Sequence, residues 1–402
     1  MKGLSVMRQL NAFLWLNFKN NFLLFLIFSF FTLNLYAYDQ KMPDSTIVRI
    51  KVFSALKSIN LGSTSPYVIT LVSSNKLIKQ GFFLATTKIE KEAFKGFKIG
   101  DEYYQDNALL VSTNAGVVFV NDRRFRGEIK IIWNEVDKGF DIINNVSVHD
   151  YLKGVLCLEI SPGWHIEAIK AQAIVARTYA YNKIEKPVSP DYDMTADVYS
   201  QMYGGVYAED PRTTLAVDQT AGMVMSKNGK IIPVFYFSTC GGYTEDSTAI
   251  WDVVSPCLKA VKCNYCKKAS NYHWIFHIDL DTISKNLETF PGSFKGVGIS
   301  AINILDTSIS GRVKWMEVVY KNGKSIKMSG NTFRIKVDPT DLKSTKFDVK
   351  ISGNECIFEG YGWGHGVGLC QWGAKHLAED ENYTAQEILK FYFNNPEFII
   401  EK

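Results

Sequence analysis

Short runs of β-branched and apolar residues, interrupted by polar positions, fill the chain from residue 46 to about residue 145. Ile47–Val52 and Tyr67–Val72 are two of these runs, and similar runs follow at 108–120 and 128–133, broken by Asn and Gly. Runs of this composition, bounded by such residues, are typical of β-strands. The pattern predicts a β-rich N-terminal region over residues 38–145, in which no residue stands out as catalytic.

The apolar spacing becomes helical after residue 146. Residues 151–158 form an apolar run that stops before Pro162, and apolar and small residues then recur three and four positions apart over 166–184. This spacing predicts a long helix that ends before Pro187, because proline cannot continue a helix. Lys170 and Arg177 lie seven residues apart, which places both on one face of this helix.

The remainder of the chain mixes both patterns. Strands are predicted at 231–238 and 302–336, a glycine-rich segment follows near residue 360, and a terminal helix is predicted over Thr384–Phe393. We therefore expect an α+β, β-rich fold whose region 146–402 carries the chemistry. In this fold a cleft lies between the helix with Lys170 and Arg177 and the glycine-rich segment.

The first 37 residues have the order of a secretory signal. Lys2, Arg8 and Lys19 precede the apolar run Phe22–Leu33, and Ala37 follows. This run is shorter than the roughly 20 residues that a membrane-spanning helix needs. Leu35 is larger than the residue preferred two positions before a cleavage site, so a cleaved signal and an uncleaved anchor both remain open. Either one predicts export to the periplasm or cell envelope.

Composition excludes several classes of protein. The 402 residues are 46% hydrophobic and 13% aromatic, which is typical of a folded chain, and the net charge of +4 is low for a nucleic-acid-binding protein. No nucleotide-, flavin- or phosphate-binding motif occurs, so we expect no organic cofactor and no nucleic-acid partner.

Glu159 is the candidate catalytic acid. It follows an apolar run and precedes Pro162-Gly163, at the end of a predicted buried helix. Partial burial raises the pKa of a carboxyl group, which suits a general acid at neutral pH. The alternative is a glutamate that only caps the helix or pairs with a neighbour. Arg177 in its alanine-rich helix needs a carboxylate or anion if it is buried, and a plain internal ion pair would also satisfy it.

Two glycine-containing segments are candidate binding surfaces. Ser238, Gly241 and Gly242 follow a predicted strand, where paired glycines allow close approach of a ligand. In the segment 360–373, glycine alternates with other residues, which would weaken an ordinary strand. Its Trp363, His365 and Gln371 are suited to stacking on sugar rings and to hydrogen-bonding hydroxyl groups.

Four cysteines stand close together in the sequence, namely Cys240, Cys257, Cys263 and Cys266. Four thiols can hold a zinc ion tetrahedrally, and two disulfides suit an oxidising envelope. The spacing does not match a standard zinc pattern, so we expect disulfides, with zinc as the alternative. Either arrangement has a structural role.

Several of these segments, in the same order, resemble the SpoIID family (stage II sporulation protein D and the related LytB amidase enhancers). The resemblance covers roughly residues 46 to 400. The matching stretches are 148–155, Glu159, 168–173, 176–180, 200–205, 238–245 with Trp251, 310–313 with Gly330, and 364–368.

The resemblance implies a lytic transglycosylase that cuts the β-1,4 bond after N-acetylmuramic acid in peptidoglycan and leaves 1,6-anhydro ends. The family's sporulation enzymes act on strands stripped of stem peptides. By the same resemblance, Glu159 is the catalytic acid and Lys170 and Arg177 are its helix lysine and arginine, with Arg177 holding Glu159 or a substrate acetamide. Tyr203, Ser238, His365 and Gln371 then line the glycan groove, and a cell-wall amidase is a candidate partner.

The chain departs from the family at two places. Some relatives bind zinc through His and Cys after the arginine helix, whereas Pro187–Tyr203 contains neither residue, so no metal site is assigned there. Cys370 stands where the family often has serine, which implies a lining role. The rival interpretation is a non-catalytic glycan-binding protein that stimulates an amidase. Sporulation, division and wall remodelling all remain open as the process.

Overall fold

The computed structural model describes residues 45–92, 96–113, 116–197, 200–251 and 253–401. The predicted signal or anchor segment, residues 1–37, lies outside the described residues. Within the described part of the chain, no helix has the length and apolar character needed to cross a membrane. These described residues belong to one compact unit.

Two antiparallel sheets account for the predicted β-rich region. Buried positions alternate with exposed or partly exposed ones over residues 47–53 of β1, as expected for a strand with one face on a core. The seven-stranded sheet has the spatial order β13 (Met194–Thr195), β1 (Ile47–Leu56), β12 (Gly139–Ser147), β11 (Glu128–Asn134), β8 (Ala108–Thr113), β3 (Tyr67–Leu71) and β4 (Lys76–Gly81), in which only β13 runs parallel to its neighbour.

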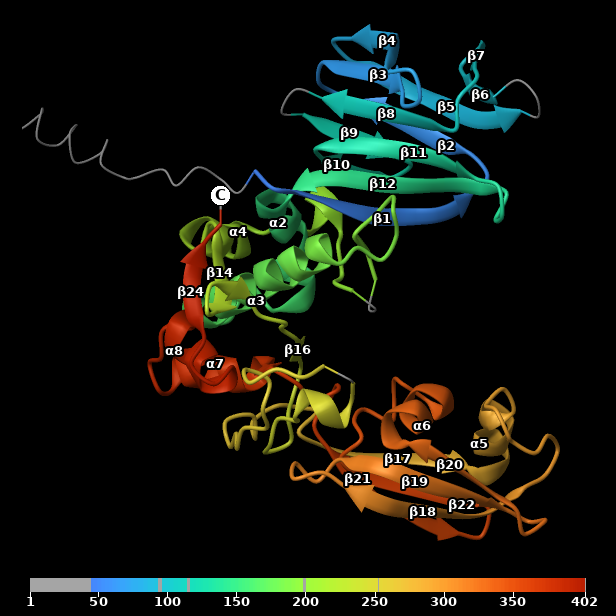
Figure 1. Ribbon diagram of the computed structural model, residues 1–402, viewed down its shortest axis with the longest axis vertical. Helices are drawn as coiled ribbons and strands as arrows, with labels where there is room; N and C mark the ends of the chain where they lie inside the picture. The colour runs from blue at the N-terminus through green and yellow to red at the C-terminus, as the bar shows by residue number, and fades with distance from the viewer. Residues whose placement is uncertain (1–44, 93–95, 114–115, 198–199, 252, 402) are drawn as a thin grey trace, which may run out of the picture. The chain divides into compact units, whose positions relative to one another are not determined.

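The second sheet has six strands, which are labelled in Figure 1. It shares a hydrophobic core with the first sheet. Phe97 of this sheet stacks on Phe140 of the first sheet, with ring centroids 5.8 Å apart. Its spatial order is β10 (Arg123–Arg126), β9 (Val117–Val120), β2 (Ile59–Ser63), β5 (Leu84–Glu92), β6 (Gly96–Ile99) and β7 (Glu102–Tyr104).

Two helices follow β12 directly, as the sequence predicted. α2 (Val148–Glu159) begins at Ser147, whose hydroxyl accepts a hydrogen bond from the Asp150 amide, and α3 (Ile166–Glu185) begins at His165. The sequence placed a domain boundary between residues 145 and 146, close to the change from β12 to α2. This boundary stays a prediction.

α3 is buried on two sides. Ile169, Ala173, Ala176 and Ala180 belong to the core of the two sheets, whereas Ala168, Ala171, Ile174 and Val175 belong to a second core. Small side chains let both cores approach one helix closely. The second core contains α7 (Gln371–Glu379), α8 (Ala385–Tyr392), β14 (Met223–Lys227), β16 (Tyr236–Phe237) and β23 (Leu369–Cys370).

Smaller helices and strands complete the region around α2 and α3. α4 (Pro211–Gln219) packs on α2 and α3, and its N-cap Asp210 accepts hydrogen bonds from two amides. β14 pairs with β15 (Lys230–Ile231) and β24 (Glu397–Ile400), β16 pairs in parallel with β23, and two short 3-10 helices span Gly205–Ala208 and Ser247–Ala249. The predicted strand 231–238 is thus mostly irregular.

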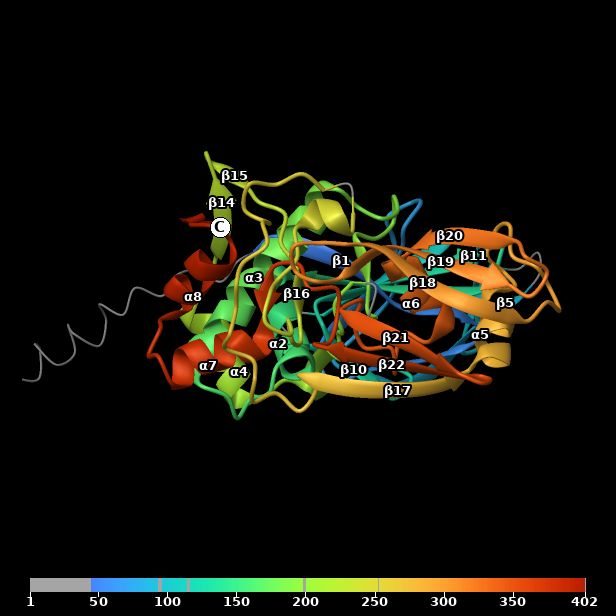
Figure 2. The same ribbon diagram turned by 90° about the horizontal axis from the view of Figure 1, so that it is seen from below.

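Residues 273–361 build a third core from two three-stranded sheets and two helices. Figure 2 shows β17 (His273–Asp279), β22 (Glu355–Tyr361) and β21 (Phe347–Ser352) side by side. The other sheet consists of β18 (Ile299–Thr307), β19 (Val313–Tyr320) and β20 (Ser325–Ser329), and α5 (Leu280–Leu287) and α6 (Gly330–Val337) pack on this core. The prediction of strand up to residue 336 was wrong, because Ser329 caps a helix through the Thr332 amide.

Candidate active site

One pocket of about 460 Å³ gathers most of the candidate residues. Glu159 comes from the end of α2, Ser238 from the segment after β16, and Trp363, His365 and Gln371 from the glycine-rich segment and the start of α7. The remaining lining residues are Tyr179, Ser200, Met202, Phe235, Tyr236, Phe237, Trp251 and Gly364. Among the described residues that line this pocket, Glu159 carries the only carboxyl group.

Glu159 is half-buried and held by two donors. Its Oε1 accepts a hydrogen bond from the Met202 backbone amide at 2.8 Å, and the Tyr236 hydroxyl also bonds to the carboxylate. Burial raises the pKa of Glu159 above its ordinary value, and the two hydrogen bonds oppose this rise. The carboxyl therefore holds its proton to a higher pH than an exposed glutamate, as a general acid requires.

Tyr236 is fixed by a second contact. The Gln201 amide nitrogen lies 3.3 Å from the Tyr236 hydroxyl oxygen and donates to it. Burial holds the pKa of Tyr236 well above its ordinary value, so the phenol stays protonated and can donate to Glu159. The acid thus sits at the end of a short chain of hydrogen bonds from Gln201.

Gln371 connects the glycine-rich segment to the acid. Its Nε2 donates to the backbone carbonyl of Glu159 at 2.9 Å and lies 3.4 Å from Oε1 of Gln172 on α3. Gln371 is also the first residue of α7 and lines the pocket. Its amide therefore fixes the end of α2, which carries Glu159, against two other helices.

His365 is a neutral residue of the pocket wall. Its Nδ1 accepts from the Val367 amide at 3.0 Å, so Nε2 carries the proton and donates to the Tyr236 carbonyl, also at 3.0 Å. Burial lowers the pKa of His365 to about 3. Phe237 and Trp251 pack against the ring, with centroids 5.4 and 4.9 Å from it. Both nitrogens are occupied by backbone, so His365 does not act as an acid or base.

The alternating glycines are explained by backbone conformation. Gly362, Gly364, Gly366 and Gly368 all have positive φ, which other residues rarely adopt. A Cβ on Gly366 would lie 2.5 Å from the Arg312 guanidinium carbon, and one on Gly368 would lie 2.2 Å from the Phe235 carbonyl oxygen. The segment is thus a tightly packed turn structure that presents Trp363 and His365 to the pocket.

Arg177 is buried as predicted, and its hydrogen bonds hold the end of another helix, α4. Its guanidinium donates to the carbonyls of Val217 and Met223 and to the Thr220 hydroxyl, at 3.2 to 3.3 Å. These groups lie at the C-terminal end of α4 and just beyond it, where unpaired carbonyls and the helix dipole favour a cation. These contacts indicate a structural role, and the expected role in holding the acid or the substrate stays a prediction.

Lys170 also lies outside the pocket lining. Its ammonium pairs with Glu167 Oε1 at 2.8 Å, and the other oxygen of Glu167 accepts from the Ala385 amide at the start of α8. This pair supports the packing of α8 on α3. A shared helix face did not bring Lys170 to the acid, because the pocket adjoins another part of the helix, at Tyr179.

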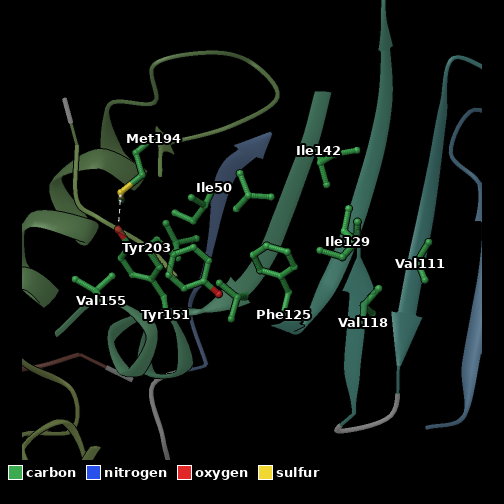
Figure 3. Packing of buried hydrophobic residues seen from close by; sticks show 14 of the residues in the cluster. Ile50, Val111, Val118, Phe125, Ile129, Ile142, Tyr151, Val155, Met194 and Tyr203 are labelled. Carbon is green, nitrogen blue, oxygen red and sulfur yellow. Dashed lines mark hydrogen bonds between the residues drawn. The ribbon is translucent and has the colours of Figure 1, made fainter. Parts of the chain in front are cut away.

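Tyr203 belongs to the core of the sheets (Figure 3). Its hydroxyl donates to Asn144 Oδ1 at 2.8 Å, and its ring packs on Tyr151, with centroids 5.0 Å apart. The side chain is buried, so the expected place in the glycan groove is wrong. The neighbouring Met202 reaches the site instead, through its backbone amide.

Gly241 and Gly242 do not line the pocket either. Both have positive φ, and the Gly241 carbonyl accepts from Lys346 Nζ at 2.8 Å. The glycine pair therefore forms a turn behind the pocket wall, next to Cys240.

The cysteines also assemble differently from the expectation. All seven are free thiols, contrary to the preference for disulfides. Cys240, Cys263 and Cys266 cluster with Cys370, whereas Cys257 is not part of this group. Cys370 is fully buried, so it does not line the pocket.

Sequence reasoning missed several lining residues. Tyr179, Met202 and Tyr236 were not singled out, and Trp251 entered only through the family resemblance. Met202 contributes a backbone amide, which no residue pattern indicates. Tyr236 lies in a short apolar run whose irregular backbone decides which side chains face the pocket. The family-matching stretches 176–180 and 200–205 contain Tyr179 and Met202 and were the available signal for these two residues.

Comparisons with known proteins agree with the earlier resemblance. The family model described as stage II sporulation protein matches residues 136–226, which include Glu159 and all of α3. The chain is 31% identical over 268 residues to the stage II sporulation protein D of Bacillus amyloliquefaciens, covering 62% of this chain and 74% of that protein. The chain belongs to the SpoIID family.

Other relatives of this SpoIID chain have different lengths. An uncharacterized protein of Brachyspira hyodysenteriae is 30% identical over 306 residues, with 76% of this chain and 80% of that protein covered. The amidase enhancer of Bacillus subtilis is 33% identical over 288 residues, which span 60% of this chain and 39% of the enhancer. Residues 247–368 match a domain of unknown function.

Proposed function

We propose that this SpoIID protein is an exported lytic transglycosylase that cleaves peptidoglycan glycan strands between N-acetylmuramic acid and N-acetylglucosamine. The observation that carries the proposal is Glu159, the one carboxyl among the described lining residues of the pocket, with a pKa raised by burial. The N-terminal segment with its signal-like order supports export to the periplasm or cell envelope.

A single carboxyl group suffices for this reaction. Ordinary glycosidases need two, one as acid and one as nucleophile or base. In a lytic transglycosylase, protonated Glu159 gives its proton to the glycosidic oxygen as the bond from C1 of N-acetylmuramic acid to that oxygen breaks. The C6 hydroxyl of the same sugar attacks C1, and the Glu159 carboxylate takes the hydroxyl proton. The products are a free N-acetylglucosamine 4-hydroxyl and a 1,6-anhydro end, and no water is consumed.

The rest of the pocket suits a sugar chain. Trp363, which is 39% exposed, and Trp251 offer aromatic surface for the apolar faces of sugar rings. Ser238 and Ser200 provide hydroxyls for polar contacts. Neutral His365 adds no charge beside the acid.

A second function rests on one of the relatives. The Bacillus subtilis protein at 33% identity is named an amidase enhancer. If this chain has the same function, its pocket binds glycan without cleaving it, and the chain stimulates a cell-wall amidase. The two functions differ in whether Glu159 makes and breaks bonds.

The decisive experiment is digestion of purified peptidoglycan, both intact and treated with an amidase, followed by mass spectrometry of the products. Wild type is compared with Glu159→Gln and with Glu185→Gln, an exposed carboxyl at the end of α3. We expect 1,6-anhydro ends from wild type and Glu185→Gln, and at least a hundredfold less from Glu159→Gln.

Two other results would change the conclusion, and a third would define the substrate. Glycan binding by all three proteins without any product would favour the binding protein that stimulates an amidase. Equal product from wild type and Glu159→Gln would mean that another group is the acid. Release from amidase-treated strands alone would identify stripped glycan as the substrate.

A further inference from the structure

Four buried thiols meet behind the pocket wall. The Sγ atoms of Cys240, Cys263, Cys266 and Cys370 all lie within 4.8 Å of one another. Each of these residues is at most 1% exposed. They come from three separate segments: the turn after β16, the loop at 257–272, and β23, so that only the fold brings them together.

The spacing of the sulfur atoms fits a tetrahedral metal ion. Zinc–sulfur bonds of about 2.3 Å place the four sulfurs of a tetrahedron roughly 3.8 Å apart. The distance between Cys240 Sγ and Cys266 Sγ is 3.3 Å. Cys263 and Cys266 also form a Cys-x-x-Cys pair, a common spacing for two ligands from one turn. Two disulfides would require only two close pairs, not four mutually close sulfurs.

Backbone amides point at the sulfurs. The Cys240 amide donates to Cys370 Sγ at 3.3 Å, and the Gly242 amide donates to Cys266 Sγ. Such donors stabilise thiolate ligands and orient them. The positive φ values of Gly241 and Gly242, 69° and 105°, create the turn that aims this amide. The glycine pair, predicted to bind glycan, thus has a role next to the thiols.

Two cationic side chains lie next to the thiol cluster. The fully buried Arg312 donates to the Cys240 carbonyl at 2.9 Å, and Lys346 Nζ donates to the Gly241 carbonyl at 2.8 Å. Ser310 connects Arg312 to Glu245, which offsets one of the two cations. A zinc ion with four thiolates carries a net charge of −2, so cations nearby reduce the cost of burying it.

We propose that Cys240, Cys263, Cys266 and Cys370 bind one Zn²⁺ ion tetrahedrally as thiolates. On binding, the four thiols release four protons. All four positions are filled by protein, which is typical of a structural zinc site. The ion joins the turn that follows Ser238 to the residue that precedes Gln371, so it stabilises the pocket wall from behind. Cys257, expected from the sequence to be part of the group, has no part in the site.

The first test is direct and independent of glycan cleavage. The full chain, produced in a bacterial envelope and extracted in detergent, is analysed for metal by mass spectrometry and for free thiols after denaturation without reductant. We expect about one zinc per chain and seven titratable thiols. Cobalt replacing zinc should give the intense visible absorption of a tetrahedral thiolate complex. A zinc-free chain in which four of these thiols are oxidised to disulfides would overturn the proposal.

Matched cysteine variants locate the ligands. Cys370→Ser should lower the zinc content at least fivefold at equal chelator concentration, whereas Cys257→Ser, an equally buried control, should keep it. Loss of zinc in Cys257→Ser with retention in Cys370→Ser would contradict the assignment. If Cys370→Ser does not fold, cobalt spectra of Cys257→Ser still decide the matter, because an unchanged four-sulfur spectrum excludes Cys257 as a ligand. A protein that binds zinc but does not cleave glycan would refute only the proposed catalysis.

Discussion

The side-chain amide of Gln371 donates to the backbone carbonyl of Glu159 at 2.9 Å, although the two residues are 212 positions apart. This contact joins the glycine-rich segment to the helix end that carries the proposed acid. A carboxyl group that must meet a glycosidic oxygen needs a fixed backbone, since an error of about 1 Å is costly to catalysis. Gln371 is therefore a positioning residue.

Replacing Gln371 by leucine should remove this support. We expect kcat to fall roughly tenfold to hundredfold, because the end of α2 loses its anchor. KM for glycan should change much less, since the aromatic surface of the pocket remains. Steady-state kinetics on soluble glycan strands measure both constants, and Trp372→Phe next to it serves as control. A rise in KM at constant kcat would instead make Gln371 a substrate-binding residue.

The activity should depend on pH through Glu159. Burial raises the pKa of this carboxyl, so cleavage should persist to higher pH than an ordinary glutamate would allow and then decline as the proton is lost. The Tyr236 hydroxyl lowers that pKa by its hydrogen bond, so Tyr236→Phe should move the decline to still higher pH. Rate profiles of both proteins check this, and identical declines would show that Tyr236 does not tune the acid.

Glu159→Gln should also affect stability in a pH-dependent way. The folded carboxyl keeps its proton at pH values where the unfolded one, with its ordinary pKa, has lost it. The free energy of unfolding contributed by this group is therefore complete at acid pH and falls as pH rises through the folded pKa. The variant lacks this fall, so it should gain stability relative to wild type between acid and neutral pH. Urea denaturation at both pH values measures the difference, and a constant difference would argue against a raised pKa.

The stability contributed by His365 should depend on pH in the opposite direction. Its pKa is lowered from 6.5 to about 3 in the folded chain, so the unfolded chain binds more protons between these values. The stability from this group is complete above about pH 6.5 and is lost as pH falls, by at most about 1.4 kcal/mol per pH unit. His365→Gln should flatten the acid side of the stability curve measured by urea denaturation. A variant with an unchanged acid slope would mean that His365 charges freely in the folded protein.

Substitutions of Arg177 and Lys170 should lower the stability of the protein without a direct effect on glycan binding or cleavage. Arg177→Met leaves the carbonyls at the end of α4 without their donors, and should cost on the order of 2–4 kcal/mol in the free energy of unfolding. Lys170→Met loses a partly exposed ion pair, which contributes about 0–1 kcal/mol. Denaturant titration measures both, with glycan affinity of the folded variants as the control. A large loss of affinity in either one would restore its predicted place in the binding site.

Local patterns in the sequence determined a good part of this molecule. Runs of β-branched residues and the three-and-four spacing of small residues predicted β1, β3, β11, α2 and α3 within a few positions, because one buried face imposes its period on the chain. Glu159 was recognisable from its own neighbours, an apolar run and a Pro-Gly break. The alternating glycines of 360–373 likewise indicated an unusual backbone, which the positive φ values bear out.

Contacts between distant segments were decided only by the tertiary structure. Arg177 and Lys170 share a helix face by period, yet one lies at the end of α4 and the other next to α8, because different elements pack along α3. Cys370 joins Cys240, Cys263 and Cys266 in place of the nearer Cys257. Periodicity constrains a residue relative to its own element alone. Which element it meets depends on how separate elements pack to bury their apolar faces. Local residue patterns along the chain do not indicate that packing.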